Sequence, residues 1–354
     1  MKILILCLPG IGDALMATPI VNILRQAYPL ARIDVATMFD SVSYIFKHNP
    51  HIQHVYHLPL YKQEKLIGIK SILSLRKEKY DVSILSFPTF RREYHIVQWL
   101  IGAKKRIGHV FPKGHWSECN FLDTDHIPVD EGEHNVINNL NLLEGVGIDW
   151  KNKIGKEKLH YEFILDQKDS TFGKEYVKNL HLEKSDIVAM HPGSIDSKAG
   201  VLKRWSIDRF AKIAKYLIQK KKKILIFIGP FEKELGEELY RLIDNKENCF
   251  LIKDMNFAHA VGILSNVKLL IANDNGFAHI ANALKIPSIV LFGPTNSIWC
   301  GPYDSDFVTI VRKAMFSPWF RNDMKVTNPP SNAQSGMEKI SVDDVILAMS
   351  PYIK

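Results

Sequence analysis

Four turns in the second half of the chain are candidates to hold an anion. Each follows a short apolar run that is expected to form a strand, and they are His191–Ser194, Gly229–Pro230, Asn273–Gly276 and Gly293–Thr295. Ligands of open α/β sheets bind beyond the carboxyl ends of the strands, and helix N-termini there offer free N–H groups and a partial positive charge. Glycine and proline are also common in turns that have no binding function. Four such turns at one sheet edge nevertheless favour a site for an anion such as a pyrophosphate.

A basic pair follows the first of these turns. Lys203 supplies a compact charge that suits a phosphate, and Arg204 supplies a forked one. Trp205 comes next and is expected in the core or at the entry to a helix. Because the pair stands between an anion-type turn and a helix start, it strengthens the prediction of a phosphate site.

Another glycine-containing turn follows the first apolar run of the chain. The run Lys2–Leu8 leads into Pro9, Gly10 and Gly12, and glycines permit close approach to the backbone. A third glycine is missing, so the pattern is not the full dinucleotide-binding fingerprint. Asp13 stands where a helix is expected to begin, and the spacing alone is explained by a helix cap or a first-turn carboxylate.

Metal and hydrolase motifs are missing from the sequence. The triplet Asp123-Thr124-Asp125 has a D-x-D form, but three-residue matches are common by chance and this one lies in no strand-end turn. The four cysteines are far apart, and the fourteen histidines show no zinc-binding spacing. Neither a G-x-S-x-G elbow nor a P-loop occurs. We therefore expect no metal site.

Length and composition indicate a globular protein of two domains. The chain has 354 residues, of which 46% are hydrophobic and 24% charged. The net charge of +8 suits acidic partners, such as phosphorylated small molecules or an anionic membrane face, or simply keeps the surface soluble. Apart from Lys220–Lys223 the basic residues are scattered, whereas a nucleic-acid binder would need a clustered basic face. We therefore expect no nucleic-acid partner.

The apolar run at the N-terminus is too short for a signal peptide, because Pro9-Gly10 interrupts it. No apolar stretch approaches the length of a membrane span. The scattered cysteines fit reduced thiols. These features together predict a cytoplasmic protein.

Expected strands and helices alternate in two successive blocks. The expected strands are 2–8, 32–36, 55–58 and 80–86 in the first block, and 186–190, 223–228, 250–252, 268–272 and 288–292 in the second. Alternation with short connections indicates an α/β protein with parallel doubly wound sheets. We therefore predict two Rossmann-like domains, 1–160 and 161–339, followed by a C-terminal helix within 340–354.

Taken together, these motifs resemble glycosyltransferase family nine, the heptosyltransferases of lipopolysaccharide assembly. The resemblance runs nearly end to end, and its specificity lies in the set rather than in any single piece. The matching residues are Gly10, Gly12 and Asp13 with Thr18-Pro19, Gly102–Gly108, His134 with Gly147-Ile148, His191–Ser194 with Lys203–Trp205, Asn273–Gly276 with His279, Phe292–Thr295, and Ile340–Val342.

The resemblance implies a GT-B architecture, in which two Rossmann-like domains face each other across a cleft that holds the active site. The C-terminal helix would pack back on the first domain. The implied reaction is an inverting transfer from an ADP-heptose co-substrate, without a metal or another cofactor. The implied acceptor is an anionic lipopolysaccharide-core glycan or glycolipid, which leaves room for peripheral contact with the inner membrane.

Residue by residue, the resemblance makes Asp13 the base that deprotonates the acceptor hydroxyl. Pro9, Gly10 and Gly12 would form the acceptor-side loop around it. On the donor side, Ser194 and Lys203 would bind the phosphates, Asp274, Asn275, Gly276 and His279 would line the diphosphate and sugar, and Glu232 and Met255 would hold the ribose and adenine.

Departures from the family pattern bear mainly on the acceptor. Cys7 stands where related enzymes can carry a basic residue, and 312–336 lacks the cysteine-rich pattern of many members. Arg91 and Arg92 are candidates to bind an acidic acceptor, although a solvated pair at a strand end explains them equally. Three other interpretations remain: a GT-B transferase with another nucleotide sugar and a protein or other glycan acceptor, a non-catalytic sugar-nucleotide-binding protein, and an NAD-type oxidoreductase, which the incomplete fingerprint disfavours.

Overall fold

The computed structural model describes residues 1–60, 65–111, 118–153, 159–194, 198–303, 305–315, 317 and 336–353. The chain divides into two compact units, one spanning Met1–Ile164 and the other beginning at Leu165. The sequence had placed this boundary after residue 160, four residues earlier. The segment 312–336, which departs from the family's cysteine-rich pattern, lies mostly outside the described residues.

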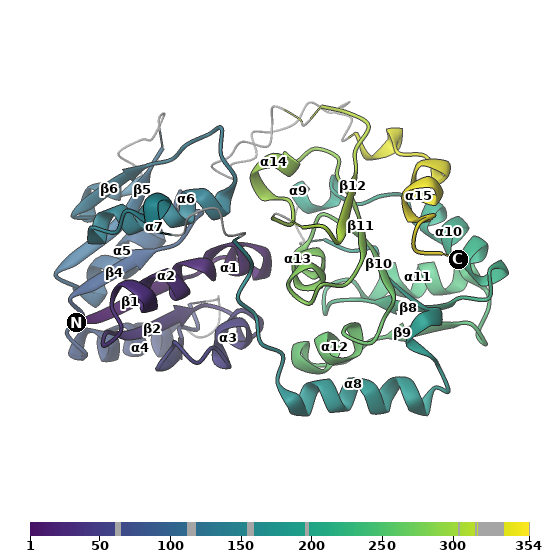
Figure 1. Ribbon diagram of the computed structural model, residues 1–354, viewed down its shortest axis with the longest axis horizontal. Helices are drawn as coiled ribbons and strands as arrows, with labels where there is room; N and C mark the ends of the chain where they lie inside the picture. Colours follow the sequence, from purple (N-terminus) through teal and green to yellow (C-terminus); the bar gives the residue numbers. More distant parts are fainter. Residues whose placement is uncertain are drawn as a thin grey trace. The chain divides into compact units, whose positions relative to one another are not determined.

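Unit 1 is built on a parallel sheet of six strands, in the order β3-β2-β1-β4-β5-β6 (Figure 1). The strands are β1 (Lys2–Cys7), β2 (Arg32–Thr37), β3 (His54–His57), β4 (Val82–Leu85), β5 (Lys105–Val110) and β6 (Asp125–Pro128). The chain starts in the middle at β1, moves outward to β3, and returns to the other side of β1 at β4. The strand order therefore reverses between β1 and β4, and such a reversal opens a crevice for ligands at the carboxyl ends of those strands.

The helices of unit 1 cover both faces of this sheet. They are α1 (Ile11–Ala17), α2 (Pro19–Ala27), α3 (Asp40–Lys47), α4 (Lys65–Lys77), α5 (Arg92–Ile101), α6 (Asn135–Asn141) and α7 (Trp150–Lys153), with the 3₁₀ turns η2 (Asn120–Leu122) and η3 (Leu142–Val146). Helices α4 and α5 pack side by side, and their inner residues share one apolar core with Leu4 and Leu6 of β1. Right-handed crossovers place α1, α2 and α3, which connect β1, β2 and β3, on the opposite face.

Unit 2 repeats this plan with the strand order β12-β11-β10-β7-β8-β9, again entirely parallel. The strands are β7 (Ile187–His191), β8 (Lys223–Phe227), β9 (Cys249–Ile252), β10 (Leu269–Asn273), β11 (Ser288–Leu291) and β12 (Val308–Val311). The helices are α8 (Gln167–Asn179), α9 (Lys198–Val201), α10 (Ile207–Gln219), α11 (Lys233–Ile243), α12 (Phe257–Leu264), α13 (Gly276–Ala283), α14 (Ser297–Cys300) and α15 (Val342–Met349), with η4 (Lys184–Asp186) and η5 (Met337–Lys339). The strand order reverses between β7 and β10. Two doubly wound parallel sheets confirm the predicted α/β fold class.

The C-terminal helix belongs to unit 2, so the expectation that it packs on the first domain is wrong. Its residues Val345 and Met349 are buried in the core of unit 2. The indole N–H of Trp205 donates to the Ile340 carbonyl at 2.9 Å and fixes the approach to α15. A short amphipathic helix fits any apolar surface, so the sequence alone could not decide which sheet it would cover.

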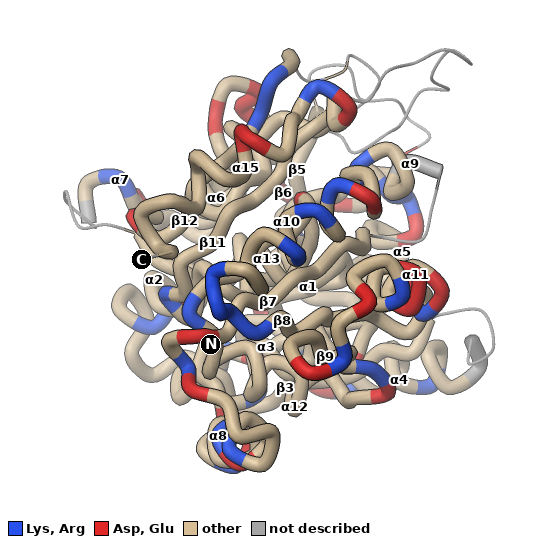
Figure 2. The backbone as a smooth tube through the Cα atoms, turned by 90° about the vertical axis from the view of Figure 1, so that its right-hand side faces the viewer, with Lys and Arg blue, Asp and Glu red and all other residues tan. Residues whose placement is uncertain are grey.

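Lys and Arg residues are spread over the described part of the chain, with Asp and Glu between them (Figure 2). None of the helices in the described ranges is long and apolar enough to cross a bilayer.

Helices α8 and α12 cross at two glycines. A Cβ atom added to Gly173 would collide with the carbonyl of Gly262, and one added to Gly262 would collide with the carbonyl of Asp169. Both obstacles are backbone atoms, so the helices would have to separate. We expect Gly262→Ala to lower the free energy of unfolding by roughly 1–3 kcal/mol, despite the better helix propensity of alanine.

Urea denaturation checks this result. Lys174→Ala is the control, because Lys174 is exposed on α8, the helix that crosses α12 at these glycines. The control is expected to stay within about 0.5 kcal/mol of the wild type. A Gly262→Ala protein as stable as the control would contradict the close crossing.

Candidate active site

The four turns singled out from the sequence lie at one edge of the unit 2 sheet. They follow β7, β8, β10 and β11, which are parallel members of the same sheet, so their carboxyl ends coincide. Three helices begin from these turns with an asparagine or glutamate at the N-cap: α11 at Glu232, α13 at Asn275 and α14 at Asn296. The prediction of a single polar edge is therefore confirmed, and its centre lies where the strand order reverses, between β7 and β10.

A buried ion pair stands at this centre. The Lys203 ammonium lies 2.7 Å from Asp274 Oδ2, and the two side chains are only 14% and 6% exposed. Thr295, on the turn after β11, donates its hydroxyl to the same carboxylate oxygen at 2.7 Å. Asp274 thus holds Lys203 at the sheet edge and neutralises it. An arriving phosphate could share this ammonium, because a lysine has three donors.

The side chains of Asn275 and Ser194 hydrogen-bond to backbone groups of the protein. They therefore hold the turns at this sheet edge in position. The Asn275 amide oxygen accepts the N–H of Phe277 at 3.0 Å, which caps α13 and orients Gly276, its first residue. The amide nitrogen of Asn275 donates to the Gly193 carbonyl at 2.9 Å and so ties the end of β10 to the end of β7. The Ser194 hydroxyl donates to the Gly200 carbonyl at 2.5 Å.

Glu232 brings a second carboxylate to the same edge. Its Oε2 accepts the backbone N–H of Gly229 at 2.8 Å and lies 3.6 Å from His191 Nε2. A Cβ on Gly193 would collide with this carboxylate, so a larger residue there would displace the Glu232 side chain from its present position. Burial lowers the pKa of His191, so a neutral ring faces the Glu232 carboxylate. The carboxylate retains the capacity to accept hydrogen bonds from ligand hydroxyl groups.

Met255 lies between β9 and α12 and is partly exposed. Because β9 pairs with β8, this loop follows the strand next to the one that leads to Glu232. An apolar side chain at this position can cover the flat face of a bound base.

His279, on α13, is 3% exposed and keeps a neutral ring beside the ion pair. Burial lowers its pKa to about 4; the Asp274 carboxylate opposes that shift and the Lys203 ammonium adds to it. A neutral imidazole can donate one hydrogen bond and accept another without adding charge.

Acidification is expected to destabilise the protein through His279 and through His109 of β5, whose pKa burial also lowers to about 4. Both values lie below the ordinary 6.5, so the stability they contribute is complete above pH 6.5 and is lost as the pH falls toward 4. Each histidine can add a slope of at most about 1.4 kcal/mol per pH unit.

Urea titrations at about pH 7 and about pH 5 measure this slope. His109 donates its Nδ1–H to the Ile127 carbonyl at 3.0 Å, and a glutamine amide can donate there without titrating. His109→Gln should therefore show a shallower loss than the wild type. Equal losses in the two proteins would contradict the assignment.

In unit 1, Asp13 is the third residue of α1 and therefore a first-turn carboxylate. Gly10 is the N-cap of that helix, so the interpretation of Asp13 as the cap is wrong. Gly12 also lies within the first turn of α1 rather than in a loop. Pro9 is buried and Gly10 exposed, so only the Pro9–Gly10 part of the predicted acceptor-side loop precedes the helix.

Asp13 shares its surroundings with Tyr94, Arg91 and Cys7. Burial raises the pKa of Tyr94 to about 12; the Arg91 guanidinium opposes that shift, and the Asp13 carboxylate adds to it. The Arg91 guanidinium carbon stands 6.0 Å from the centroid of the Tyr94 ring. Cys7 is fully buried and its pKa is raised to about 12, chiefly by burial and further by Asp13. The carboxyl ends of β1 and β4 therefore bring Asp13 and Arg91 to the reversal point of unit 1.

Arg91 is the N-cap residue of α5 and Arg92 is its first residue. Both are exposed, and Arg92 makes only a loose contact of 3.5 Å with Glu93. Exposed guanidinium groups beside a carboxylate can receive an anionic ligand.

The D-x-D triplet is occupied by contacts within unit 1. Asp123 is buried and pairs with His95 Nδ1 at 3.0 Å, while Asp125 pairs with Lys105 at 3.1 Å. Within the described part of the chain, no cluster of three or more His, Cys, Asp or Glu side chains could hold a metal ion.

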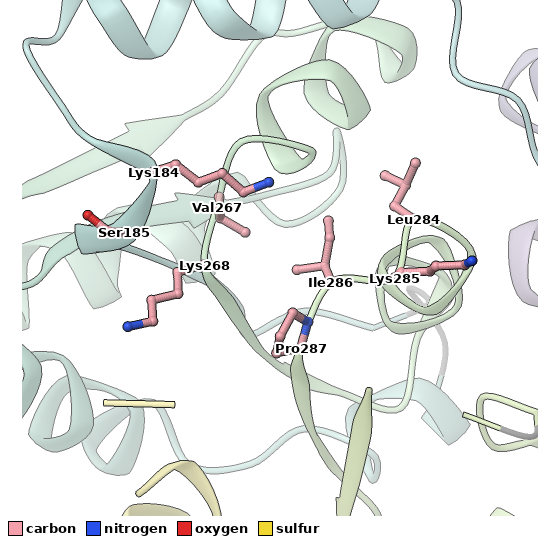
Figure 3. A pocket seen from close by; sticks show the side chains of 8 residues that line it. All are labelled: Lys184, Ser185, Val267, Lys268, Leu284, Lys285, Ile286 and Pro287. Atoms are coloured by element: carbon pink, nitrogen blue, oxygen red, sulfur yellow. The ribbon is translucent and has the colours of Figure 1, made fainter. Parts of the chain in front are cut away.

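A hollow of about 430 Å³ lies at the amino edge of the unit 2 sheet, away from these residues. Lys184, Lys268 and Lys285 line it, but their ammonium groups do not meet, because Lys268 extends away from the other two (Figure 3). The hollow therefore lacks the convergent charges of an anion site.

Comparison with known proteins identifies the family. The model of glycosyltransferase family 9 (heptosyltransferase) matches residues 69–326. The chain belongs to glycosyltransferase family 9. This family member is 25% identical to lipopolysaccharide heptosyltransferase 3 of Escherichia coli K12 over 84% of each chain. It is 26% identical to lipooligosaccharide heptosyltransferase 2 of Campylobacter jejuni, over 88% of this chain and 86% of the relative.

Solved structures share the fold of this glycosyltransferase. A family 9 glycosyltransferase from Veillonella parvula superposes with a TM-score of 0.80 at 20% identity, over 99% of this chain and 97% of the other. The E. coli ADP-heptose lipopolysaccharide heptosyltransferase II gives 0.77 at 19% identity, over 100% and 98%. The E. coli heptosyltransferase WaaC with ADP gives 0.69 at 14%, over 99% and 100%. These matches confirm the GT-B architecture.

The structure of this glycosyltransferase adds residues that sequence reasoning had not assigned to the site. Thr295 bonds Asp274, His191 approaches Glu232, and Tyr94 stands beside Asp13. Thr295 and His191 were visible in the strand-end turns, and only the side-chain contacts give them a role. Tyr94 carried no sequence signal, because it faces inward from a helix that only the fold brings to Asp13.

Proposed function

We propose that this glycosyltransferase moves a heptose from an ADP-heptose to an anionic acceptor of lipopolysaccharide core assembly, with inversion and without a metal. The observation that carries the proposal is the polar edge of unit 2, where Lys203, Asp274 and Glu232 converge. Support for the sugar comes from the relatives, which are heptosyltransferases. Support for the nucleotide comes from the ADP bound by a heptosyltransferase of similar fold.

The reaction assigns a role to each cluster. The Asp13 carboxylate takes the proton of the acceptor hydroxyl, whose oxygen attacks the anomeric carbon of the heptose from the face opposite the leaving group. The bond from that carbon to the diphosphate breaks, and ADP departs with the electron pair. The Lys203 ammonium and the N-terminus of α13 stabilise the negative charge that develops on the diphosphate.

The nucleoside is held by the remaining residues of the edge. Glu232 accepts hydrogen bonds from the ribose hydroxyls, and Met255 covers the adenine. Asp274 and His279 face the sugar and diphosphate, and Asn275 and Ser194 keep the backbone around Gly276 in place.

The acceptor molecule is anionic in this proposal. Arg91 and Arg92 receive the acidic groups of the acceptor next to Asp13. The proposed location is cytoplasmic, with peripheral contact at the inner membrane, where a glycolipid acceptor would be presented.

A panel of ADP-, GDP-, UDP- and CDP-sugars tests the donor. ADP-heptose at about a hundred times its Kd should raise the free energy of unfolding by about 2.7 kcal/mol, and the others should raise it less. Transfer assayed in excess EDTA should match transfer without chelator. Stabilisation by UDP- or GDP-sugars alone would favour a GT-B transferase with another donor. Binding of ADP-heptose without any transfer would favour a non-catalytic sugar-nucleotide-binding protein.

A further inference from the structure

Helix α4 is apolar on both its inner and outer sides. Ile72 and Leu75 are buried against the sheet, yet Ile69 and Leu73 are each 50% exposed. A surface helix normally turns charged and polar residues outward. The apolar residues facing solvent on α4 are therefore available to a partner outside the fold.

The neighbouring helix α5 continues this apolar surface. Its inner residues, among them Val97 and Ile101, join the core, whereas Ile96 is 36% exposed and Trp99 is 49% exposed. Arg76 of α4 donates to the Leu100 carbonyl of α5 at 2.8 Å, so the helices are joined along this layer. Ile69, Leu73, Ile96 and Trp99 together form what we term the α4–α5 outer face.

The outer face is bordered by positive charge. The sequence of α4 contains lysine and arginine but no aspartate or glutamate, and Lys70, Arg76 and Lys77 are exposed. Arg91 and Arg92 stand at the N-terminus of α5. One exposed acidic side chain, Glu93 of α5, also lies near this face and contacts Arg92 at 3.5 Å, so the positive charges outnumber it. Apolar side chains with a tryptophan and a surplus of lysine and arginine around them suit the interface of an anionic bilayer.

A second copy of the chain fits this face less well. A symmetric dimer sets identical patches against each other, so the lysines of one copy would face those of the other. Like charges across an interface cost free energy, whereas anionic lipid head groups gain it.

We infer that the α4–α5 outer face docks this glycosyltransferase on an anionic lipid surface. This inference rests on the proposed function in one respect, the glycolipid nature of the acceptor. Arg91 is the N-cap of α5, and its guanidinium shares the electrostatic surroundings of Tyr94 with Asp13. A bilayer against the outer face therefore presents glycolipid head groups at the sheet edge that carries Asp13.

Vesicle co-sedimentation of the full chain tests the inference without donor or acceptor. Vesicles of phosphatidylethanolamine with phosphatidylglycerol should bind the wild type, and phosphatidylcholine vesicles should bind it weakly. Leu73→Gln with Trp99→Gln should lower the partition coefficient roughly tenfold or more, because two partly exposed apolar side chains lose their place in the lipid. Lys70→Glu with Lys77→Glu should lower it as well, and should weaken its dependence on salt.

Leu30→Gln is the matched control, since Leu30 is a 99% exposed apolar residue on the loop that precedes β2 of the same unit. It should bind vesicles as the wild type does. Circular dichroism and urea denaturation confirm that each variant is folded.

Activity assays separate this inference from the proposed function. The Leu73→Gln, Trp99→Gln protein should lose transfer to a glycolipid in vesicles yet keep transfer to its soluble, delipidated oligosaccharide. Vesicle binding without transfer would sink the proposed function and leave the docking face standing. The docking inference is overturned if the wild type does not bind anionic vesicles, or if the variants bind them as strongly as the wild type. It is also overturned if the substitutions change self-association of the protein and not vesicle binding.

Discussion

Asp13→Asn is expected to lower turnover by roughly 10²–10⁴-fold while donor affinity changes little. The asparagine amide fills the same space but cannot take a proton from the acceptor hydroxyl. Asp13 stands at the carboxyl end of β1, in the electrostatic surroundings of Tyr94 and Arg91, and not at the cap position of its helix. Single-turnover transfer and donor titration on the same preparations give the two quantities.

The alternative role of Asp13 is purely structural, as a first-turn carboxylate of α1. That role contributes about 0.3–1 kcal/mol to stability and nothing to chemistry. Asp208→Asn is the matched control, because Asp208 occupies the first turn of α10. Both variants should lose similar stability, and only Asp13→Asn should lose turnover. An Asp13→Asn enzyme with turnover close to the wild type would refute the assignment of the base.

The architecture could be predicted because parallel strands buried on both faces leave continuous apolar runs. Such runs allowed four strands to be predicted from the sequence alone, namely β1, β7, β8 and β10. Strands β5 and β6 could not be read in this way. The sequence of β5 carries Lys105, Arg106 and a glycine, and Gly108 is needed because a Cβ there would collide with Asp123. β6 is a four-residue edge strand that ends at a proline.

The candidate site was predictable as a set of turns, and its internal contacts were not. Sequence spacing showed that Asn275 and Ser194 follow strands, but not that their side chains bond to Gly193 and Gly200. Nor could it show that Lys203 meets Asp274 across 71 positions. These contacts depend on the strand order, which places β10 beside β7 and leaves no trace in local periodicity.

Lys203→Gln is expected to weaken binding of ADP-heptose by roughly 10–150-fold, because a hydrogen bond to a charged group contributes about 1.5–3 kcal/mol. It should also slow transfer, since the charge on the departing diphosphate grows in the transition state. This pattern differs from that of Asp13→Asn, which spares binding. Isothermal titration with the donor and single-turnover transfer measure both effects.

The ion pair with Asp274 complicates this variant and also supplies its control. Removing Lys203 leaves a carboxylate that is 6% exposed and keeps the Thr295 hydroxyl as a hydrogen-bond donor but no cation, so Lys203→Gln should also lower stability. Adding Asp274→Asn removes that unpaired charge and should restore part of the stability. Donor affinity should not recover, because the ammonium is still missing. If the double variant regained both stability and affinity, Lys203 would be a structural partner of Asp274 and not a ligand of the diphosphate.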